Sequence, residues 1–222
     1  VGEILAGIDV RVAASEHTAT FANYYDEGER SQVLLASAGK IPQEVLPAGW
    51  TQPDILFAGP LLHELPTDCV NWFEPGLSCL MPSGWLRRWG PDGAITHGDR
   101  LPPPRAGTPK WSVIVVSESE VRDLPEQQLF DLGEIVCVTR GERGVRIWRD
   151  GSWFEIPAIP AAPVDLTGAG DVWATTFAIA LSEQNDLEGA GRYASVAAAI
   201  SIESAGLTGC PSREAITERS TL

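Results

Sequence analysis

The sequence predicts one α/β domain built around a mainly parallel β-sheet. Four short runs are apolar without alternation, and intervals long enough for helices or loops separate them: residues 54–59, 77–81, 111–116 and 134–139. Continuous apolarity is typical of strands that are buried on both faces of a sheet. Residues 169–183 and 187–204 are instead rich in Ala with Leu, Ile and Val, which predicts two packed helices. Buried strands followed by helices favour the α/β class.

Two hairpins flank the four predicted buried strands. The segments "HTATFANYY" and "RSQVLLA" are separated by "DEGE", whose glycine tolerates the positive φ of a hairpin loop, so a ribbon is expected near residues 17–36. The later stretch "GVRIWRDGSWFEI" turns at Asp150 and Gly151. It would add antiparallel strands at one edge of the sheet.

The connections and helix starts also have sequence signals. The Pro-rich stretch at residues 100–109 predicts a loop. Asn185, with Glu188 three residues later, fits the capping box of the second C-terminal helix.

Composition excludes several classes of function. The 222 residues include 16 Lys and Arg against 30 Asp and Glu, a formal net charge of −14, which repels nucleic acid and anionic membranes. The four cysteines show neither a CxxC pair nor a zinc spacing with the three histidines, and read as reduced thiols. No apolar run approaches the roughly 18 residues of a membrane span, and no leader opens the chain, so a cytoplasmic protein is expected. The start at Val1, without a methionine, suggests a fragment or a processed product.

The stretch "VDLTGAGDVWATTFAIAL" places a glycine-rich turn directly before the first predicted helix. A helix N-terminus presents unpaired N–H groups, so Gly168, Ala169 and Gly170 are expected to form an anion hole for a phosphate. Asp171 would repel that anion and is instead expected to face the attacking nucleophile as a catalytic base, kept ionised by the helix dipole. The alternative is a plain tight turn, with Asp171 as a first-turn acid that complements the dipole.

"DLTGAGD" resembles the D-T-x-G-A-G-D signature of the ribokinase-like carbohydrate kinases, the PfkB family. The resemblance implies a three-layer α/β/α fold with a small β-ribbon lid, and Mg²⁺- and ATP-dependent phosphorylation of a hydroxyl on a sugar, polyol or nucleoside. It implies that Asp171 is the base and that Asp165 and Thr167 shape the loop. Residues 1–222 would form a single domain, with residues of about 8–36 in the lid.

Three further stretches resemble parts of this family. "VTRGERGVRIW" is similar to a strand, turn and strand beside the nucleotide, which implies cofactor contacts from Thr139, Arg140, Gly141 and Gly144; a plain hairpin turn is the alternative. "VVSESEVRDL" aligns Glu120 with a glutamate that organises the water around Mg²⁺, although Ser117 and Glu120 equally make a capping box. "RYASVAAAISIESAG" is similar to the adenine-site wall, where Ser195 and Ala198 would line the pocket or only pack helices.

The earlier half carries the expected acceptor side. "TATFANYYDEGERSQ" resembles the lid strands, with Phe21 and Asn23 as expected substrate contacts, although alternation in a half-exposed ribbon explains the same residues. "MPSGWLRRWGPDG" resembles a segment of inositol-type members, but Met81 and Ser83 replace its acid and its amide. Arg87 and Arg88 would face phosphate or only solvate the surface.

An early Gly-Gly segment that holds the substrate in the family is missing here. "VGEI" resembles the family's first strand, and "LAGIDVRV" already resembles the approach to the lid, so a substantial N-terminal block is expected to be deleted, absent from the chain or replaced. The resulting exposed apolar surface suggests a covering chain, such as a homodimer partner. Two functions stay open: a kinase, and a non-catalytic nucleotide-binding remnant that acts through association. The acceptor and any dependence on a monovalent cation are left open.

Overall fold

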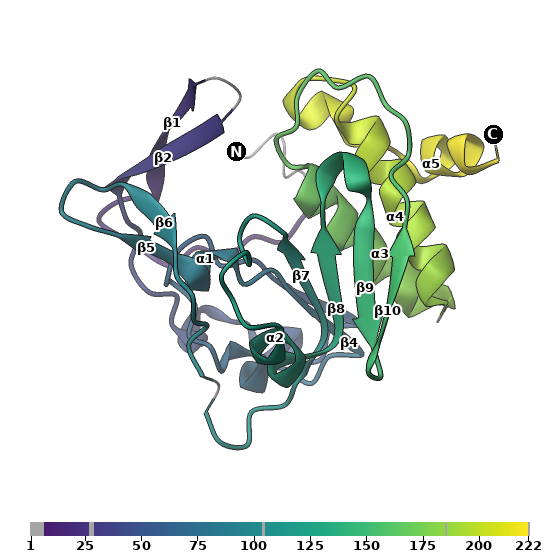
Figure 1. Cartoon of the computed structure of the whole chain (residues 1–222). Helices are drawn as coiled ribbons and strands as arrows, with labels where there is room; N and C mark the ends of the chain where they lie inside the picture. Colours follow the sequence, from purple (N-terminus) through teal and green to yellow (C-terminus); the bar gives the residue numbers. More distant parts are fainter. Residues whose placement is uncertain (1–6, 27–28, 104, 185, 222) are drawn as a thin grey trace.

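The computed structural model describes residues 7–26, 29–103, 105–184 and 186–221 and contains a six-stranded sheet in the order β10-β9-β8-β7-β4-β3 (Figure 1). The four predicted buried strands run parallel to one another and are β3 (Ile55–Ala58), β4 (Leu77–Leu80), β7 (Trp111–Ser117) and β8 (Gly133–Thr139). The predicted hairpin forms β9 (Val145–Arg149) and β10 (Ser152–Ile156), antiparallel at the sheet edge. Asp150 and Gly151 turn it with φ of 51° and 82°. The predicted mainly parallel α/β sheet is therefore confirmed.

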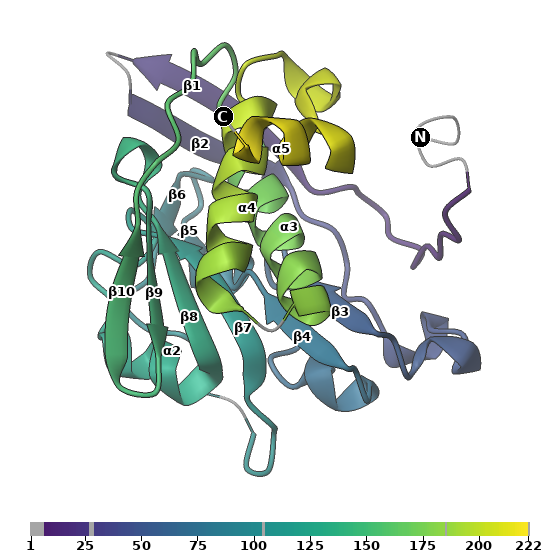
Figure 2. The ribbon, with the colours of Figure 1, turned by 90° about the vertical axis from the view of Figure 1, so that its right-hand side faces the viewer.

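Helices cover both faces of this sheet, as the three-layer prediction requires. The helices α3 (Ala169–Gln184) and α4 (Leu187–Ser201) pack side by side on one face (Figure 2), where Trp173 stacks on Phe177 with ring centroids 4.8 Å apart. The short helix α2 (Glu126–Leu132) lies on the other face, over a second core that includes Trp85 and Trp111. The sheet is therefore the middle layer between two apolar cores.

The expected lid is a ribbon of β1 (Thr20–Asp26) and β2 (Glu29–Ala36) that projects from the sheet domain (Figure 1). Residues 7–19 contain no helix or strand, so the strands begin later than the residue 8 or 17 expected from the sequence. A small hairpin of β5 (Arg87–Trp89) and β6 (Ile95–His97) adjoins the ribbon. The Leu34 N–H donates to the Gly93 carbonyl over 2.8 Å, and Val33 forms a bridge to Ala94. The ribbon is therefore anchored to this hairpin.

The remaining elements are short. The helices are α1 (Ser83–Leu86) and α5 (Arg213–Ser220). The 3-10 turns are η1 (Gln43–Val45), η2 (Ala48–Trp50), η3 (Cys69–Trp72), η4 (Gly141–Arg143) and η5 (Gly206–Gly209). The Pro-rich segment at residues 100–109 has no regular structure in its described part, as predicted.

The N-cap prediction for α4 was wrong by one residue. The carboxylate of Asp186 accepts hydrogen bonds from the Glu188 and Gly189 amides at 3.2 and 3.3 Å and caps the helix. Asn185 itself lies outside the described residues, as does the strand expected at "VGEI". The helix also ends at Ser201, three residues before the predicted end.

The cysteines are free thiols, as predicted. Burial raises the pKa of Cys69 to about 11 and that of Cys79 to about 12, whereas Cys210 is exposed. Among the described residues, every helix is too short or too polar to cross a membrane.

Candidate active site

The predicted anion hole lies at the start of α3. Gly168 has a φ of 83°, which strains any residue with a side chain, and a Cβ there would meet no atom within 4 Å. Its carbonyl accepts from the Val172 N–H over 2.9 Å, so the helical hydrogen bonds begin at this glycine. The first amides of a helix have no partner in the preceding turn of the same helix. The Ala169 N–H donates a long hydrogen bond of 3.4 Å to the Leu166 carbonyl. Gly168, Ala169 and Gly170 together form a half-buried, positively polarised backbone surface that suits an anion.

Asp165 ties the glycine-rich loop to the C-terminal region. One carboxylate oxygen accepts from the Thr167 N–H at 2.9 Å and the other from the Gly206 N–H at 3.0 Å. These hydrogen bonds hold the pKa of Asp165 below its ordinary value. Asp165 thus shapes the glycine-rich loop by joining it to Gly206, 41 residues later in the chain.

Asp171 is exposed at the surface, yet the surrounding protein changes its proton affinity. Loss of hydration raises the pKa of this carboxyl, the negative charge of Glu120 raises it further, and the positive charge of Arg87 opposes both. The sequence had predicted a weak base, because a helix dipole lowers such a pKa. Loss of hydration and the Glu120 charge act in the opposite direction and raise the pKa of Asp171.

The position of Glu120 is compatible with both roles that the sequence left open, a capping box and a metal site. Its carboxylate accepts from the Ser117 N–H over 2.9 Å, which is half of a capping box, although no helix follows. It also faces Asp171 closely enough to raise the pKa of that residue. The described residues contain no group of three or more His, Cys, Asp or Glu side chains arranged to hold a metal ion. Mg²⁺ needs only one or two carboxylates when phosphate and water supply the other ligands, so the metal role of Glu120 stays a prediction.

A cavity of about 200 Å³ lies where β7 and β8 end side by side. It is lined by Ser117, Glu118, Ser119, Thr139, Arg140 and Gly141. Ligands of parallel α/β sheets bind at the carboxyl ends of the strands, so this cavity is in the right place for part of a nucleotide.

The two glycines of the turn between β8 and β9 play different parts. Gly141 has a φ of 56° and faces open space, whereas Gly144 has a φ of 78° and packs tightly against the end of β10. The Arg140 guanidinium donates to Glu155 at 3.2 Å and to the Arg143 carbonyl at 3.1 Å, and is thus already engaged within the protein. Thr139, Arg140 and Gly141 all line the cavity. The Thr139 hydroxyl donates to the Val116 carbonyl over 3.3 Å, so Gly141 is the predicted cofactor residue of this turn that faces open space.

Ser195 and Ala198 lie on α4, and Ser195 is almost fully buried. Its hydroxyl accepts a hydrogen bond of 3.1 Å from the Trp173 indole, which joins α3 to α4. Ala198 is half-buried against the same core. Both positions have a packing role, and their predicted contact with a nucleotide stays a prediction.

The lid contributes one residue near the candidate base. The guanidinium of Arg87 lies over the Phe21 ring, 5.3 Å from its centroid, and its charge reaches Asp171. Asn23 lies farther along the ribbon, exposed, and accepts from Gln32 at 2.7 Å. Phe21 thus contacts Arg87, whose charge acts on Asp171, whereas Asn23 is engaged with Gln32 on the ribbon. The sequence signal for Arg87 was only a pair of adjacent arginines, which does not say which of them faces the site.

Comparisons with known proteins show what this chain is similar to. Residues 108–214 match the family model described as pfkB family carbohydrate kinase. The chain is 43% identical to ribokinase of Bacillus subtilis over 82 residues, which is 36% of this chain and 28% of that protein. It is 45% identical to cytidine kinase of Thermococcus kodakarensis over 58 residues, 25% of this chain and 20% of that protein. The matched segments thus span less than a third of these relatives.

Solved structures resemble a much larger part of the chain. Ribokinase from Thermotoga maritima superposes with a TM-score of 0.66 at 21% identity, covering 91% of this chain and 69% of that one. A pyrophosphate-dependent kinase in the ribokinase family, complexed with a pyrophosphate analog and myo-inositol, gives a TM-score of 0.69 at 16% identity, covering 92% of this chain and 74% of that one. At these identities the likeness shows the fold, which is ribokinase-like.

Proposed function

Residues 108–214 match the pfkB family model, and from this premise we propose that the chain is the donor-binding and catalytic part of a kinase of that family. The reaction would transfer the γ-phosphate of ATP to a hydroxyl of a small sugar, a polyol such as inositol, or a nucleoside. We propose that the described chain is a single domain with the β1–β2 ribbon as its lid. The proposed partner is a small hydroxylated molecule, and the proposed setting is cytoplasmic.

The observation that carries this proposal is the position of Asp171 one residue after the anion hole. A phosphate held by the amides of Gly168–Gly170 would lie beside a carboxylate whose pKa is raised. Phosphoryl transfer needs the acceptor hydroxyl to be positioned in line and deprotonated late, so one well-placed carboxylate suffices. Asp171 would hold the hydroxyl and accept its proton.

The other predicted contacts surround this point. The adenine would lie between the turn of residues 139–144 and the region of residues 193–206. Phe21 from the lid and Arg87 from β5 would close the acceptor side, and Asn23 would act only if the lid moves. Glu120 would hold Mg²⁺ through water, since its carboxylate is already fixed by the Ser117 amide. The metal supplies charge neutralisation on the donor phosphates when bound.

The test is a coupled assay of phosphoryl transfer over a panel of pentoses, hexoses, polyols and nucleosides, with ATP and with pyrophosphate as donors. Asp171→Asn is expected to lower turnover by about 10²–10⁴-fold. ATP affinity should stay equal or rise slightly, because the change removes a negative charge beside the γ-phosphate. Isothermal titration measures that affinity independently of turnover.

Glu188→Gln is the matched control, because Glu188 is the first-turn acid of α4 as Asp171 is of α3. If both substitutions lowered turnover equally, or if Asp171→Asn lowered it only a fewfold, Asp171 would merely complement the helix dipole. If ATP bound while the parent chain turned over no acceptor, the non-catalytic nucleotide-binding remnant would be the better description.

A further inference from the structure

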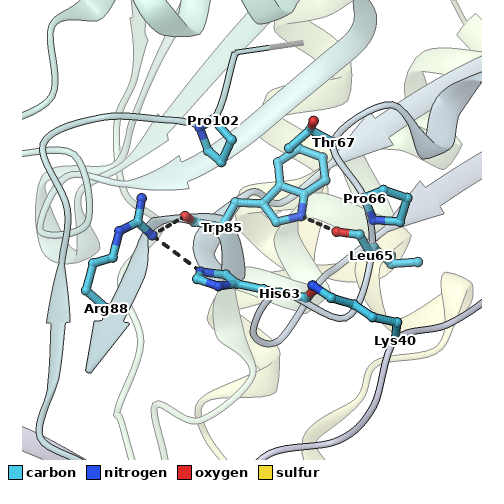
Figure 3. A pocket seen from close by; sticks show the side chains of 8 residues that line it. All are labelled: Lys40, His63, Leu65, Pro66, Thr67, Trp85, Arg88 and Pro102. Carbon is cyan, nitrogen blue, oxygen red and sulfur yellow. Dashed lines mark hydrogen bonds between the residues drawn. The ribbon is translucent and has the colours of Figure 1, made fainter. Parts of the chain in front are cut away.

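A second cavity, of about 230 Å³, lies outside the candidate active site (Figure 3). It is lined by Lys40, His63, Leu65, Pro66, Thr67, Trp85, Arg88 and Pro102. None of these residues lines the cavity at the ends of β7 and β8 or belongs to the anion hole. The two hollows are therefore separate.

The short strand β5 lies between this cavity and the lid. Successive side chains of a strand point to opposite faces. Arg87 turns toward Phe21 and the candidate base, and Arg88 turns the other way and lines the cavity. Lys40 reaches the cavity from the segment that follows the lid, and its ammonium donates to the His63 carbonyl. The two adjacent arginines therefore belong to different sites: Arg87 lies on the side of Phe21, and Arg88 lines the cavity.

The cavity is cationic within a strongly acidic chain. Arg88 and Lys40 line it from different segments, and its lining contains no carboxylate. The nearest acidic neighbours in sequence are already engaged. Glu64 accepts from the Leu61 and Leu62 amides at 2.5 and 2.8 Å, and Asp68 pairs with Arg105 at 2.9 Å. In a chain with a net charge of −14, this concentration of positive charge without acidic lining is unusual.

The guanidinium of Arg88 is held rigidly in place. Its NH1 group donates to the Trp85 and Arg87 carbonyls at 2.6 and 2.9 Å, and its NH2 group donates to the Arg100 carbonyl at 3.2 Å. A fixed guanidinium loses little conformational entropy when it meets an anion. His63 lies between the two cations, and its pKa is lowered chiefly by burial; the charges of Arg88 and Lys40 add to this, while a hydrogen bond to the Arg87 carbonyl and the charge of Glu64 oppose it. The positive charge of the cavity therefore comes from Arg88 and Lys40, and its lining holds no carboxylate.

The volume limits what can bind. At about 30 Å³ per water molecule, the cavity has room for roughly eight waters. Pockets for larger ligands usually measure about 300–1,000 Å³. We propose that this cavity is a binding site for a small anion that carries a phosphate group, either inorganic phosphate or a phosphate ester of a small metabolite. Lys40 and Arg88 contact the phosphate oxygens, Thr67 offers a hydroxyl, and the rings of Trp85, Pro66 and Pro102 form the apolar wall.

The first experiment is isothermal titration of the chain with inorganic phosphate, with glycerol phosphate and with glycerol. The Lys40→Met variant is expected to bind phosphate about fivefold to tenfold more weakly than the parent. Lys110→Met is the matched control, because Lys110 is also exposed and also donates to a backbone carbonyl, that of Phe130, at 2.8 Å. It should bind as the parent does. Tighter binding of glycerol phosphate would identify an ester as the ligand, and tighter binding of inorganic phosphate would identify the free ion.

Phosphate can also enter the anion hole, so the two sites must be separated. Gly170→Ala crowds the anion hole and should abolish phosphate binding there. Phosphate binding at the cavity, which Lys40→Met weakens, should remain. Arg88→Lys gives a second variant that keeps the charge and loses the fixed fork, with folding checked by circular dichroism. The proposal is overturned if the parent binds neither phosphate compound, or if Lys40→Met and Lys110→Met bind phosphate equally. Neither result depends on whether the chain transfers phosphate.

Discussion

Gly144→Ala should destabilise the protein far more than Gly141→Ala, although both glycines lie in one turn and have positive φ. A Cβ on Gly144 would lie 2.0 Å from the Ile156 carbonyl oxygen and 2.7 Å from the Ala158 amide nitrogen. Ordinary contacts begin near 3.4 Å, so the backbone after β10 would have to move by more than 1 Å. At Gly141 the same Cβ meets nothing within 4 Å.

The magnitudes follow from these two cases. The left-handed backbone alone costs a residue with a side chain about 1–2 kcal/mol, and this is the whole expected cost at Gly141. Gly144 adds an overpacking cost of about 1–3 kcal/mol against backbone that has no rotamer to change. We therefore expect a loss of about 2–5 kcal/mol in the free energy of unfolding for Gly144→Ala.

Urea denaturation followed by tryptophan fluorescence measures both losses. Nucleotide titration of the folded variants measures the complementary effect. Because Gly141 lines the cavity, Gly141→Ala should lower the affinity for ATP more than it lowers the free energy of unfolding. Equal destabilisation by the two substitutions would refute the assignment of Gly144 to packing and of Gly141 to the cavity.

Three further predictions concern single carboxylates. Glu120→Gln keeps an acceptor for the Ser117 amide but removes the charge, so it should weaken the Mg²⁺ dependence of turnover with little loss of stability; an unchanged dependence on Mg²⁺ would assign Glu120 to structure alone. Asp186→Ala removes the cap of α4 and should cost about 1 kcal/mol in urea denaturation, and no loss would contradict the cap. The pKa of Asp171 is raised in the folded state above the ordinary value of 3.8. Between these two pKa values the native state binds more protons than the unfolded chain, so the contribution of this group to stability falls as pH rises. Asp171→Asn should therefore be as stable as the parent or more stable at pH 7, with the difference vanishing below pH 3.8, and a less stable variant at pH 7 would contradict the sign.

Much of the fold could be predicted because its signals are local. The apolar runs at residues 111–116 and 134–139 predict strands buried on both faces, and Asp150 with Gly151 supplies the positive φ of a tight hairpin. The start of α3 could be predicted for the same reason, since a glycine-rich turn before an apolar run has few other structures available.

The failures concern information that a sequence does not carry locally. Asn185 and Asp186 are both good caps, and the choice between them depends on backbone angles. The partner of Ser195 is Trp173, 22 residues away, and no local pattern in the sequence indicates this buried hydrogen bond. The strands of the β5–β6 hairpin have three residues each, too few to show a period.

Within the candidate site, the sequence identified the types of residue better than their partners. It placed Asp171 after the anion hole, but the direction of its pKa depends on Glu120 and on burial, which need coordinates. It also treated Arg87 and Arg88 as one feature, and only the strand direction separates them.

The bond between Leu34 and Gly93 has a mechanical consequence. Because β2 is tied to the β5–β6 hairpin, the ribbon and this hairpin would move together rather than as two independent flaps. Motions of such coupled units occupy microseconds to milliseconds, whereas a free ribbon relaxes in nanoseconds. Amide resonances of β1, β2, β5 and β6 should then share one exchange rate in relaxation-dispersion spectra. A phosphate bound to Arg88 would slow this joint motion, because Arg88 belongs to β5.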